Sequence, residues 1–183
     1  MLEIISGGLY TTVQDLPGRL GLWNVGVPPS GPMDSLAFRV ANLLVGNPDT
    51  EAGLEITMYG PEIRFHRDTA IAVTGAPLDA RLNGKDVPWL QPVPVKKGDE
   101  LVFEGLTGAG CRTYLAVRGG IDVPLYLGSR STFPKGGFGG HMGRQLETGD
   151  SLPLGNAGGE DLILQLLDQL RILFQDVADR LAA

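Results

Sequence analysis

The chain has 183 residues, which is enough for one sizeable hydrophobic core. With 43% hydrophobic and 20% charged residues it is expected to fold, and its net charge of −6 gives no bulk attraction to nucleic acid or to an anionic membrane. Its 27 glycines and 13 prolines are too many for a helical bundle and favour short strands joined by tight turns.

The cysteine and histidine content restricts the metal sites that the chain can form. The single cysteine, Cys111, excludes an intramolecular disulfide and a cysteine-rich zinc site. The two histidines, His66 and His141, lie far apart in the sequence and make a poor metal set. No apolar run is long enough to cross a bilayer, and residues 1–5 lack a signal-peptide pattern. We therefore expect a cytoplasmic protein that binds no metal, no nucleic acid and no membrane.

The N-terminal part predicts two short strands followed by a long loop. Residues 2–5 and 9–13 are β-type runs separated by Gly7 and Gly8. Residues 14–33 then carry several glycines and prolines and show no periodicity. An irregular stretch of about 20 residues is unusual inside a compact domain, and such loops often carry function.

One helix is predicted early in the chain. Asp34 or Ser35 can cap its start, and apolar residues then recur at helical spacing along one face. Gly46 is placed to end the helix, and Pro48 prevents its continuation.

Residues 54–117 predict a series of short strands. Runs of β-type residues alternate with turns, among them the two-residue hairpin signal Asn83-Gly84 and a turn at residues 97–99. Short strands, tight turns and one early helix together predict a mainly β fold, closed or nearly closed into a barrel.

The last part of the chain divides in two. Residues 119–150 are glycine-rich and irregular, whereas residues 160–183 contain neither glycine nor proline. In that final segment apolar residues repeat with helical spacing, which predicts a C-terminal amphipathic helix of about six turns. Its apolar face must be covered, and we favour self-association through this helix over a fold-back onto the same chain.

The first candidate site lies in the long loop after the second predicted strand. Gln14, Asp15 and Arg19 place an amide, a carboxylate and a guanidinium close together, which suits recognition of a planar amide or an anion. An Asp15–Arg19 pair that fastens the loop to the fold is equally compatible with the pattern. Ser30 and Asp34 lie near the helix start, where anions are favoured, although Asp34 is also a simple cap.

A second group lies in and after the last predicted strand of the series. It contains Tyr114, Arg118, Ser129 and Arg130. Arg130 is flanked by hydroxyl residues, so its guanidinium can bind an anionic group or anchor the loop through backbone carbonyls.

The glycine-rich segment 136–143 is not a nucleotide loop, because no Lys-Ser or Lys-Thr pair follows its second glycine. His141 within it can act as a base, although a surface histidine is the favoured interpretation. His66 lies at a strand end beside Arg64 and Arg67 and is expected to be solvated.

Several of these segments together resemble one protein family. The resemblance is carried, in order, by residues 11–19, 26–34, 41–48, 54–57, 114–121 and 127–132. They look like biotin-dependent carboxyltransferase domains, a family that includes allophanate hydrolase subunit 2, the C subunit of 5-oxoprolinase and the antagonist of the Kip sensor-kinase inhibitor. The resemblance covers residues 1–155, the first of the family's usual two halves.

The resemblance implies a cyclophilin-like β-barrel at residues 1–155 and ATP-dependent opening of 5-oxoproline to glutamate. The expected partners are a B-subunit homologue of the allophanate hydrolase subunit 1 type and an A subunit. The complex uses the ATP, and this chain alone is expected to bind no cofactor. Two alternatives stay open: a component of a biotin-dependent urea or amide carboxyltransferase, and a non-catalytic module that antagonises a regulatory partner.

The resemblance also implies the site residues. Asp15, Arg19 and Arg130 are carried over as catalytic, and the substrate-binding set is Gln14, Ser30, Asp34, Tyr114, Arg118 and Ser129. Arg19 or Arg130 would hold a carboxylate or a phosphorylated intermediate, and Asp15 would orient an arginine or accept a proton. Residues 160–183 stand where the family's second half usually begins, but they resemble no part of the family. We therefore expect the isolated chain to be inactive.

Overall fold

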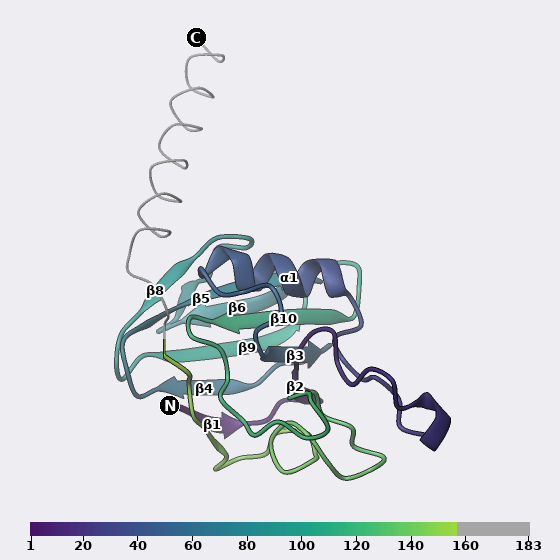
Figure 1. Cartoon of the computed structure of the whole chain (residues 1–183). Helices are drawn as coiled ribbons and strands as arrows, with labels where there is room; N and C mark the ends of the chain where they lie inside the picture. Colours follow the sequence, from purple (N-terminus) through teal and green to yellow (C-terminus); the bar gives the residue numbers. More distant parts are fainter. Residues whose placement is uncertain (157–183) are drawn as a thin grey trace.

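In the computed structural model, which describes residues 1–156, the chain forms two antiparallel β-sheets with one α-helix on an outer face (Figure 1). The elements are β1 (Leu2–Ser6), β2 (Thr11–Gln14), η1 (Trp23–Val25), α1 (Ser35–Leu44), β3 (Gly53–Thr57), β4 (Glu62–Phe65), β5 (Thr69–Gly75), β6 (Leu78–Leu82), β7 (Lys85–Asp86), β8 (Val93–Val95), β9 (Glu100–Leu106), β10 (Arg112–Val117) and β11 (Ser151–Leu152). One sheet has the order β11-β1-β4-β9-β6-β7 and the other the order β2-β3-β10-β5-β8.

The mainly β class is confirmed, but the expected closed barrel is wrong. The two sheets stay separate, because a loop and not a strand of the other sheet occupies the outer edge of β2. There the Val13 carbonyl accepts a hydrogen bond from the Thr132 amide at 2.9 Å, and the Thr11 carbonyl accepts one from the Leu146 amide at 2.8 Å. The sequence pattern shows where strands lie, whereas closure depends on these long-range contacts.

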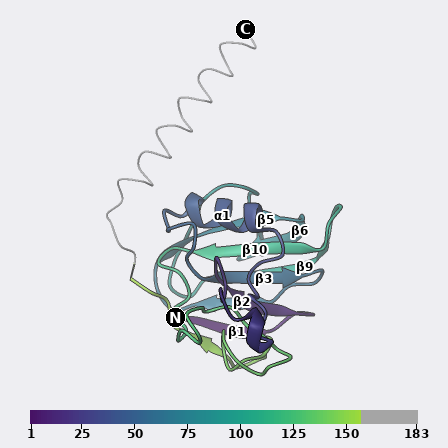
Figure 2. The same ribbon diagram turned by 45° about the vertical axis from the view of Figure 1, so that its right-hand side comes forward.

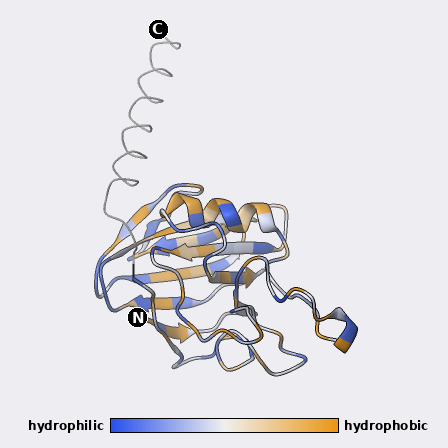
Figure 3. Ribbon diagram, in the orientation of Figure 1, coloured by the Kyte–Doolittle hydropathy of each residue, from blue (hydrophilic) through white to orange (hydrophobic). Residues whose placement is uncertain are grey.

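Hydrophobic side chains between the two sheets form the main core. Figure 3 shows hydrophobic positions, in orange, along the strands of the sheets. Ile4 and Ile63 of the first sheet and Leu54 and Leu115 of the second are each at most 1% exposed. Because side chains alternate across a strand, each sheet sends one set of residues into this core. On the other face of the second sheet, Ala72, Tyr114 and Ala116 form a smaller apolar cluster with side chains of α1.

The helix begins where the sequence predicts. The Asp34 side chain accepts a hydrogen bond from the Ala37 amide at 3.0 Å, which satisfies one of the free amides of the first turn. On its buried side, Phe38 meets the Tyr114 ring edge to face, with centroids 5.9 Å apart. Gly46 follows the helix with φ +73°, a conformation that glycine adopts readily.

The predicted hairpin turn is also confirmed, because Asn83 and Gly84 both have positive φ between β6 and β7. No helix within residues 1–156 is long and apolar enough to cross a membrane. The predicted C-terminal helix at 160–183, and the self-association assigned to it, lie outside the described residues.

Two long loops lie together beside β2 (Figures 1 and 2). Residues 15–34 leave the end of β2 and carry η1 away from the sheets, and residues 118–150 pack along β2 before the chain returns in β11. Both loops contain the residues that the sequence singles out, so the functional site is sought where they meet.

Candidate functional site

Asp15 joins the two loops at the end of β2. Its Oδ1 accepts hydrogen bonds from the hydroxyls of Ser129 at 2.5 Å and Ser131 at 2.6 Å, and its Oδ2 accepts one from the Arg130 amide at 2.6 Å. Asp15 is 7% exposed and both serines are fully buried. These contacts fix the second loop to the first. We call the group the Asp15 junction; it comprises Asp15, Ser129, Arg130 and Ser131.

Arg19 also fastens these two loops to each other. Its Nε donates to the Tyr126 carbonyl at 3.0 Å, its Nη2 donates to the Ser131 carbonyl, and the guanidinium lies 5.1 Å from the centre of the Phe138 ring. Burial lowers the pKa of Arg19, and the charge of Asp15 opposes this effect. With the side chain 1% exposed, these contacts are those of a loop anchor.

Gln14 holds the first loop to the end of its own strand. Its Oε1 accepts a hydrogen bond from the Gly31 amide at 3.1 Å, and its Nε2 donates to the Thr12 hydroxyl at 2.9 Å. Ser30, beside Gly31, has a φ of +60°. Gln14 therefore sets the path of the backbone around Ser30.

Tyr114 binds both the backbone of Asp34 and Glu55, a buried carboxylate that the sequence pattern does not single out. The Tyr114 hydroxyl donates to Glu55 Oε2 at 3.0 Å and accepts from the Asp34 amide at 2.7 Å. The Met33 amide donates to the same Glu55 oxygen at 2.7 Å. Burial is the main cause that raises the pKa of the Tyr114 hydroxyl. This contact fixes the start of α1, while the Asp34 side chain itself is exposed.

The two remaining arginines lie in different places. Arg130 donates from Nε to the Val123 carbonyl at 2.9 Å and from Nη2 to Asp122 Oδ1 at 3.4 Å, and its side chain is 29% exposed. Arg118 lies elsewhere in the fold. It lines a separate pocket of about 250 Å³ together with Asn47 and Glu51.

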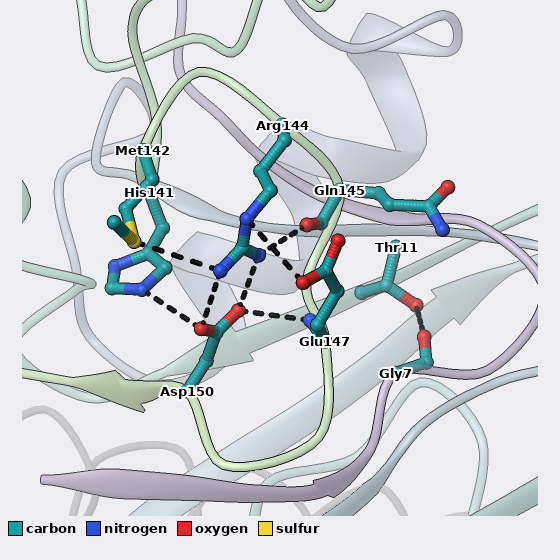
Figure 4. Close-up of polar contacts among 8 residues, drawn as sticks. All are labelled: Gly7, Thr11, His141, Met142, Arg144, Gln145, Glu147 and Asp150. Atoms are coloured by element: carbon teal, nitrogen blue, oxygen red, sulfur yellow. Dashed lines mark hydrogen bonds and ion pairs between the residues drawn. The ribbon is translucent and has the colours of Figure 1, made fainter.

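A further polar cluster lies in the second loop (Figure 4). Arg144 donates from Nη1 and Nη2 to the two carboxylate oxygens of Asp150, at 2.7 and 2.8 Å, and the Glu147 amide adds a bond of 2.8 Å. The Arg144 hydrogen bond is the main cause that lowers the pKa of Asp150 to about 2, and burial opposes it. We call Asp150, Arg144 and His141 the Asp150 junction.

His141 completes this cluster, with its Nε2 3.3 Å from Asp150 Oδ1 and its side chain 20% exposed. The surface-histidine interpretation is therefore wrong. His66 is partly exposed, with 35% of its side chain accessible, and its Nε2 also lies 2.7 Å from Glu3 Oε2. In the sequence, Asp150 follows His141 by nine residues within a glycine-rich loop, but no periodicity there reveals that the two side chains are in contact.

An open pocket of about 490 Å³ lies beside His141. Its walls include Leu125, Tyr126, Phe138 and Met142, and the Tyr126 and Phe138 rings stack with centroids 4.7 Å apart. We call it the histidine pocket. Within residues 1–156, no three or more His, Cys, Asp or Glu side chains are grouped to hold a metal ion.

Most of the chain is similar to known proteins. A model of the family described as carboxyltransferase domain, subdomain A and B, matches residues 25–175, past the boundary at residue 155 expected from the sequence. Urea amidolyase of Lachancea kluyveri is 53% identical over 150 residues, which are 82% of this chain and 8% of that protein. The C subunit of 5-oxoprolinase from Escherichia coli (strain K12) is 44% identical over 170 residues, 93% of this chain and 54% of that protein.

The fold agrees with a solved structure of the same kind. The crystal structure of Kluyveromyces lactis urea carboxylase matches with a TM-score of 0.82 and 52% identity, over 84% of this chain and 14% of that one. The chain thus spans about half the length of the 5-oxoprolinase relative and a small part of the urea enzymes. The chain belongs to the carboxyltransferase domain family, subdomain A and B.

Proposed function

We propose that this chain forms part of a carboxyltransferase-type enzyme that acts on a small planar amide together with further domains or subunits. Support comes from the family match over residues 25–175. The relatives named above are either long multidomain chains or a subunit, so the proposal includes a complex in the cytoplasm. Such a chain is expected to show no turnover alone.

Urea is the amide that we favour, with a carboxyl group as the transferred unit. The observation that supports this choice is the 52% identity to the urea carboxylase of known structure, against 44% to the 5-oxoprolinase relative. In this reaction a carrier-borne carboxybiotin supplies the carboxyl group as a co-substrate. The sequence contains no Met-Lys-Met carrier motif, so the carrier belongs to another part of the enzyme.

Opening of 5-oxoproline to glutamate is the second candidate. It is supported by a match to the C subunit of 5-oxoprolinase that extends over 93% of this chain. In this reaction the complex uses the ATP. Both candidate substrates present a planar carbonyl–nitrogen group, which arginine and amide side chains recognise through paired hydrogen bonds.

Within the site, we assign anion binding to Arg130 and loop positioning to Asp15, Arg19 and Ser129. Arg130 is 29% exposed, whereas the Arg19 guanidinium is fully enclosed and bound to two carbonyls. A rigid junction of this kind holds a partly exposed cation in a constant place, which is what recognition of a carboxylate or a phosphorylated intermediate requires.

Reconstitution tests the proposal. The chain is combined either with a biotin carboxylase, a carrier and the B-subunit homologue, or with A and B subunits and ATP. Urea-dependent consumption of the carboxylated carrier supports the first candidate, glutamate formation supports the second, and binding without turnover supports a non-catalytic module.

A matched pair of variants tests the role of Arg130. Arg130→Lys should lower the activity of the complex at least tenfold, on the order of the loss of one charge-assisted hydrogen bond, because lysine cannot reproduce the planar fork of arginine. Arg81→Lys changes an exposed arginine that pairs with Asp79 and should leave activity unchanged. Equal activity of the two variants would contradict the role assigned to Arg130.

A further inference from the structure

We propose that the histidine pocket binds a small, neutral, planar amide, with Nδ1 of His141 accepting a hydrogen bond from the amide N–H group. Asp150 is then a positioning residue that orients the imidazole ring. The choice of ligand class rests on the proposed function, while the location and the hydrogen-bond acceptor follow from the geometry.

The orientation of the ring follows from the fixed position of Asp150. Arg144 and the Glu147 amide hold both carboxylate oxygens, so the carboxylate cannot turn away from His141. A negative oxygen 3.3 Å from Nε2 favours the proton on that nitrogen. With the proton on Nε2, Nδ1 carries the lone pair, and Figure 4 shows Nδ1 on the side of the ring away from Asp150.

Nδ1 has no hydrogen-bond partner among residues 1–156, and His141 lines the pocket. A nitrogen that accepts hydrogen bonds and lies beside a cavity calls for a donor from the ligand. The N–H group of an amide, a lactam or a urea supplies such a donor.

The pocket walls favour a flat, uncharged ligand. Among the described residues that line the cavity there is no Asp, Glu, Lys or Arg, so the polar side-chain groups there are the imidazole of His141 and the hydroxyl of Tyr126. The stacked rings of Tyr126 and Phe138 offer a flat aromatic surface, and an amide plane can lie against it. A pocket of about 490 Å³ lies in the size range of small-molecule sites.

The two histidines of the sequence allow a direct test by imidazole 15N NMR on the full chain. The probes are 2-pyrrolidinone, 2-imidazolidinone and cyclopentanone, which share a five-membered ring and a carbonyl group. Only the first two carry an N–H donor. His66 is an internal control, because its Nε2 also faces a carboxylate, that of Glu3, while His66 does not line the pocket.

We expect the Nδ1 resonance of His141 to move on addition of the two N–H probes and to stay in place with cyclopentanone. The resonances of His66 should not move with any probe. Equal shifts with cyclopentanone, equal shifts at both histidines, or no shift up to the solubility limit of the probes would each overturn the proposal.

Variants separate the hydrogen bond from the fold. His141→Phe should weaken binding of 2-pyrrolidinone about fivefold, as expected for one neutral hydrogen bond, and His66→Phe should not change it. Asp150→Asn should mix the two tautomers of His141, read from the two ring nitrogens, and should weaken binding. Because this change also removes a charge next to Arg144, Tyr126→Leu, on the pocket wall, gives a second test and should weaken binding as well.

The test is independent of the assay for the proposed function. If the reconstituted enzyme converts neither urea nor 5-oxoproline while 2-pyrrolidinone still shifts His141, the pocket is supported and the proposed function fails. If the enzyme is active and His141→Phe changes neither its KM nor the binding of 2-pyrrolidinone, the proposed function is supported and the pocket fails.

Discussion

Two buried aspartates hold the long loops to the sheets, and they differ in the groups that bind them. Asp15 accepts two serine hydroxyls and a backbone amide, all of them neutral. Asp150 accepts a guanidinium and a backbone amide, and it faces the imidazole of His141. Both carboxylates are well satisfied, so both stabilise the loops.

The difference shows how one type of residue serves two purposes. The donors that hold the Asp15 carboxylate are hydroxyls and an amide, and none of them carries a charge. This junction therefore fixes the conformation of the loops. At the Asp150 junction a histidine lies against the carboxylate and also lines a pocket, so this junction borders a candidate ligand site. Burial and loop attachment alone therefore do not identify a functional carboxylate.

Removal of the Asp15 carboxylate should have the largest effect on stability. Asp15→Ala leaves the hydroxyls of Ser129 and Ser131 and the Arg130 amide without their acceptor in a buried place. We expect the free energy of unfolding, measured by urea denaturation, to fall by about 4 kcal/mol. Asp86→Ala, at a side chain 93% exposed, is the control and should cost less than about 1 kcal/mol. Similar losses for both variants would show that the Asp15 contacts contribute little.

Gly139 lies against the Arg19 anchor, and its substitution should have the next largest effect. Its φ is +72°, and a Cβ there would overlap Arg19 Nη2 and the Ser131 carbonyl. Gly139→Ala should lower the free energy of unfolding by about 3 kcal/mol, because the added Cβ strains the backbone and displaces Arg19. Gly137 also has positive φ, +68°, but open space around it, so Gly137→Ala should cost about 1–2 kcal/mol. A Gly137 variant as unstable as the Gly139 variant would contradict the assigned overlap.

The Asp150 junction should be distinguished from the Asp15 junction by its response to acid. Because the fold lowers the pKa of Asp150 from 3.8 to about 2, the ionised carboxylate stabilises the folded chain at pH above 4. This contribution, about 2 kcal/mol at neutral pH, is lost as pH falls from about 4 toward 2. The difference in unfolding free energy between the wild-type chain and Asp150→Asn should therefore shrink in acid.

The control for this pH series is Asp86→Asn, whose side chain is 93% exposed. It should change the unfolding free energy little at any pH. A difference for Asp150→Asn that stays constant from neutral pH to about pH 3 would contradict the ion pair with Arg144 as its source.

Local features of the fold are predictable from the sequence, and long-range ones are not. Asp34 identifies the start of α1, and Asn83-Gly84 identifies a hairpin, because a cap or a two-residue turn depends on its immediate neighbours. The closed barrel was wrong because the edge of β2 is bound by Thr132, a residue from a loop with no β pattern. Sheet closure depends on such pairings, which spacing along the chain does not reveal.

The same limit applies to the site. The motifs single out Asp15, Ser129 and Arg130, but Asp15 and Ser129 stand 114 positions apart, so their contact is invisible in the sequence. His141 and Asp150 are close in sequence, yet glycines between them permit many paths, so the pattern alone does not bring them together. Glu55 was missed because a glutamate in a short strand is ordinarily taken as a solvent-facing residue.

Glu55 extends the comparison to a third buried carboxylate, and Tyr114→Phe should have the smallest effect of the series. Glu55 keeps the Met33 amide when the tyrosine hydroxyl is removed, and Arg112 Nε remains 3.5 Å from its other oxygen. We therefore expect a loss of about 1 kcal/mol at neutral pH, close to one hydrogen bond. Tyr59→Phe, at a side chain half exposed, is the control and should have no measurable effect.

The same variant should also change the response to alkaline pH. Since burial raises the pKa of Tyr114, the unfolded chain releases this proton first, and the wild-type fold loses stability as pH rises above the ordinary tyrosine value of about 10. The phenylalanine variant lacks this proton, so the difference between the two chains should shrink above about pH 10, and a difference that stays constant there would show that Tyr114 is not shielded from solvent as the structure indicates.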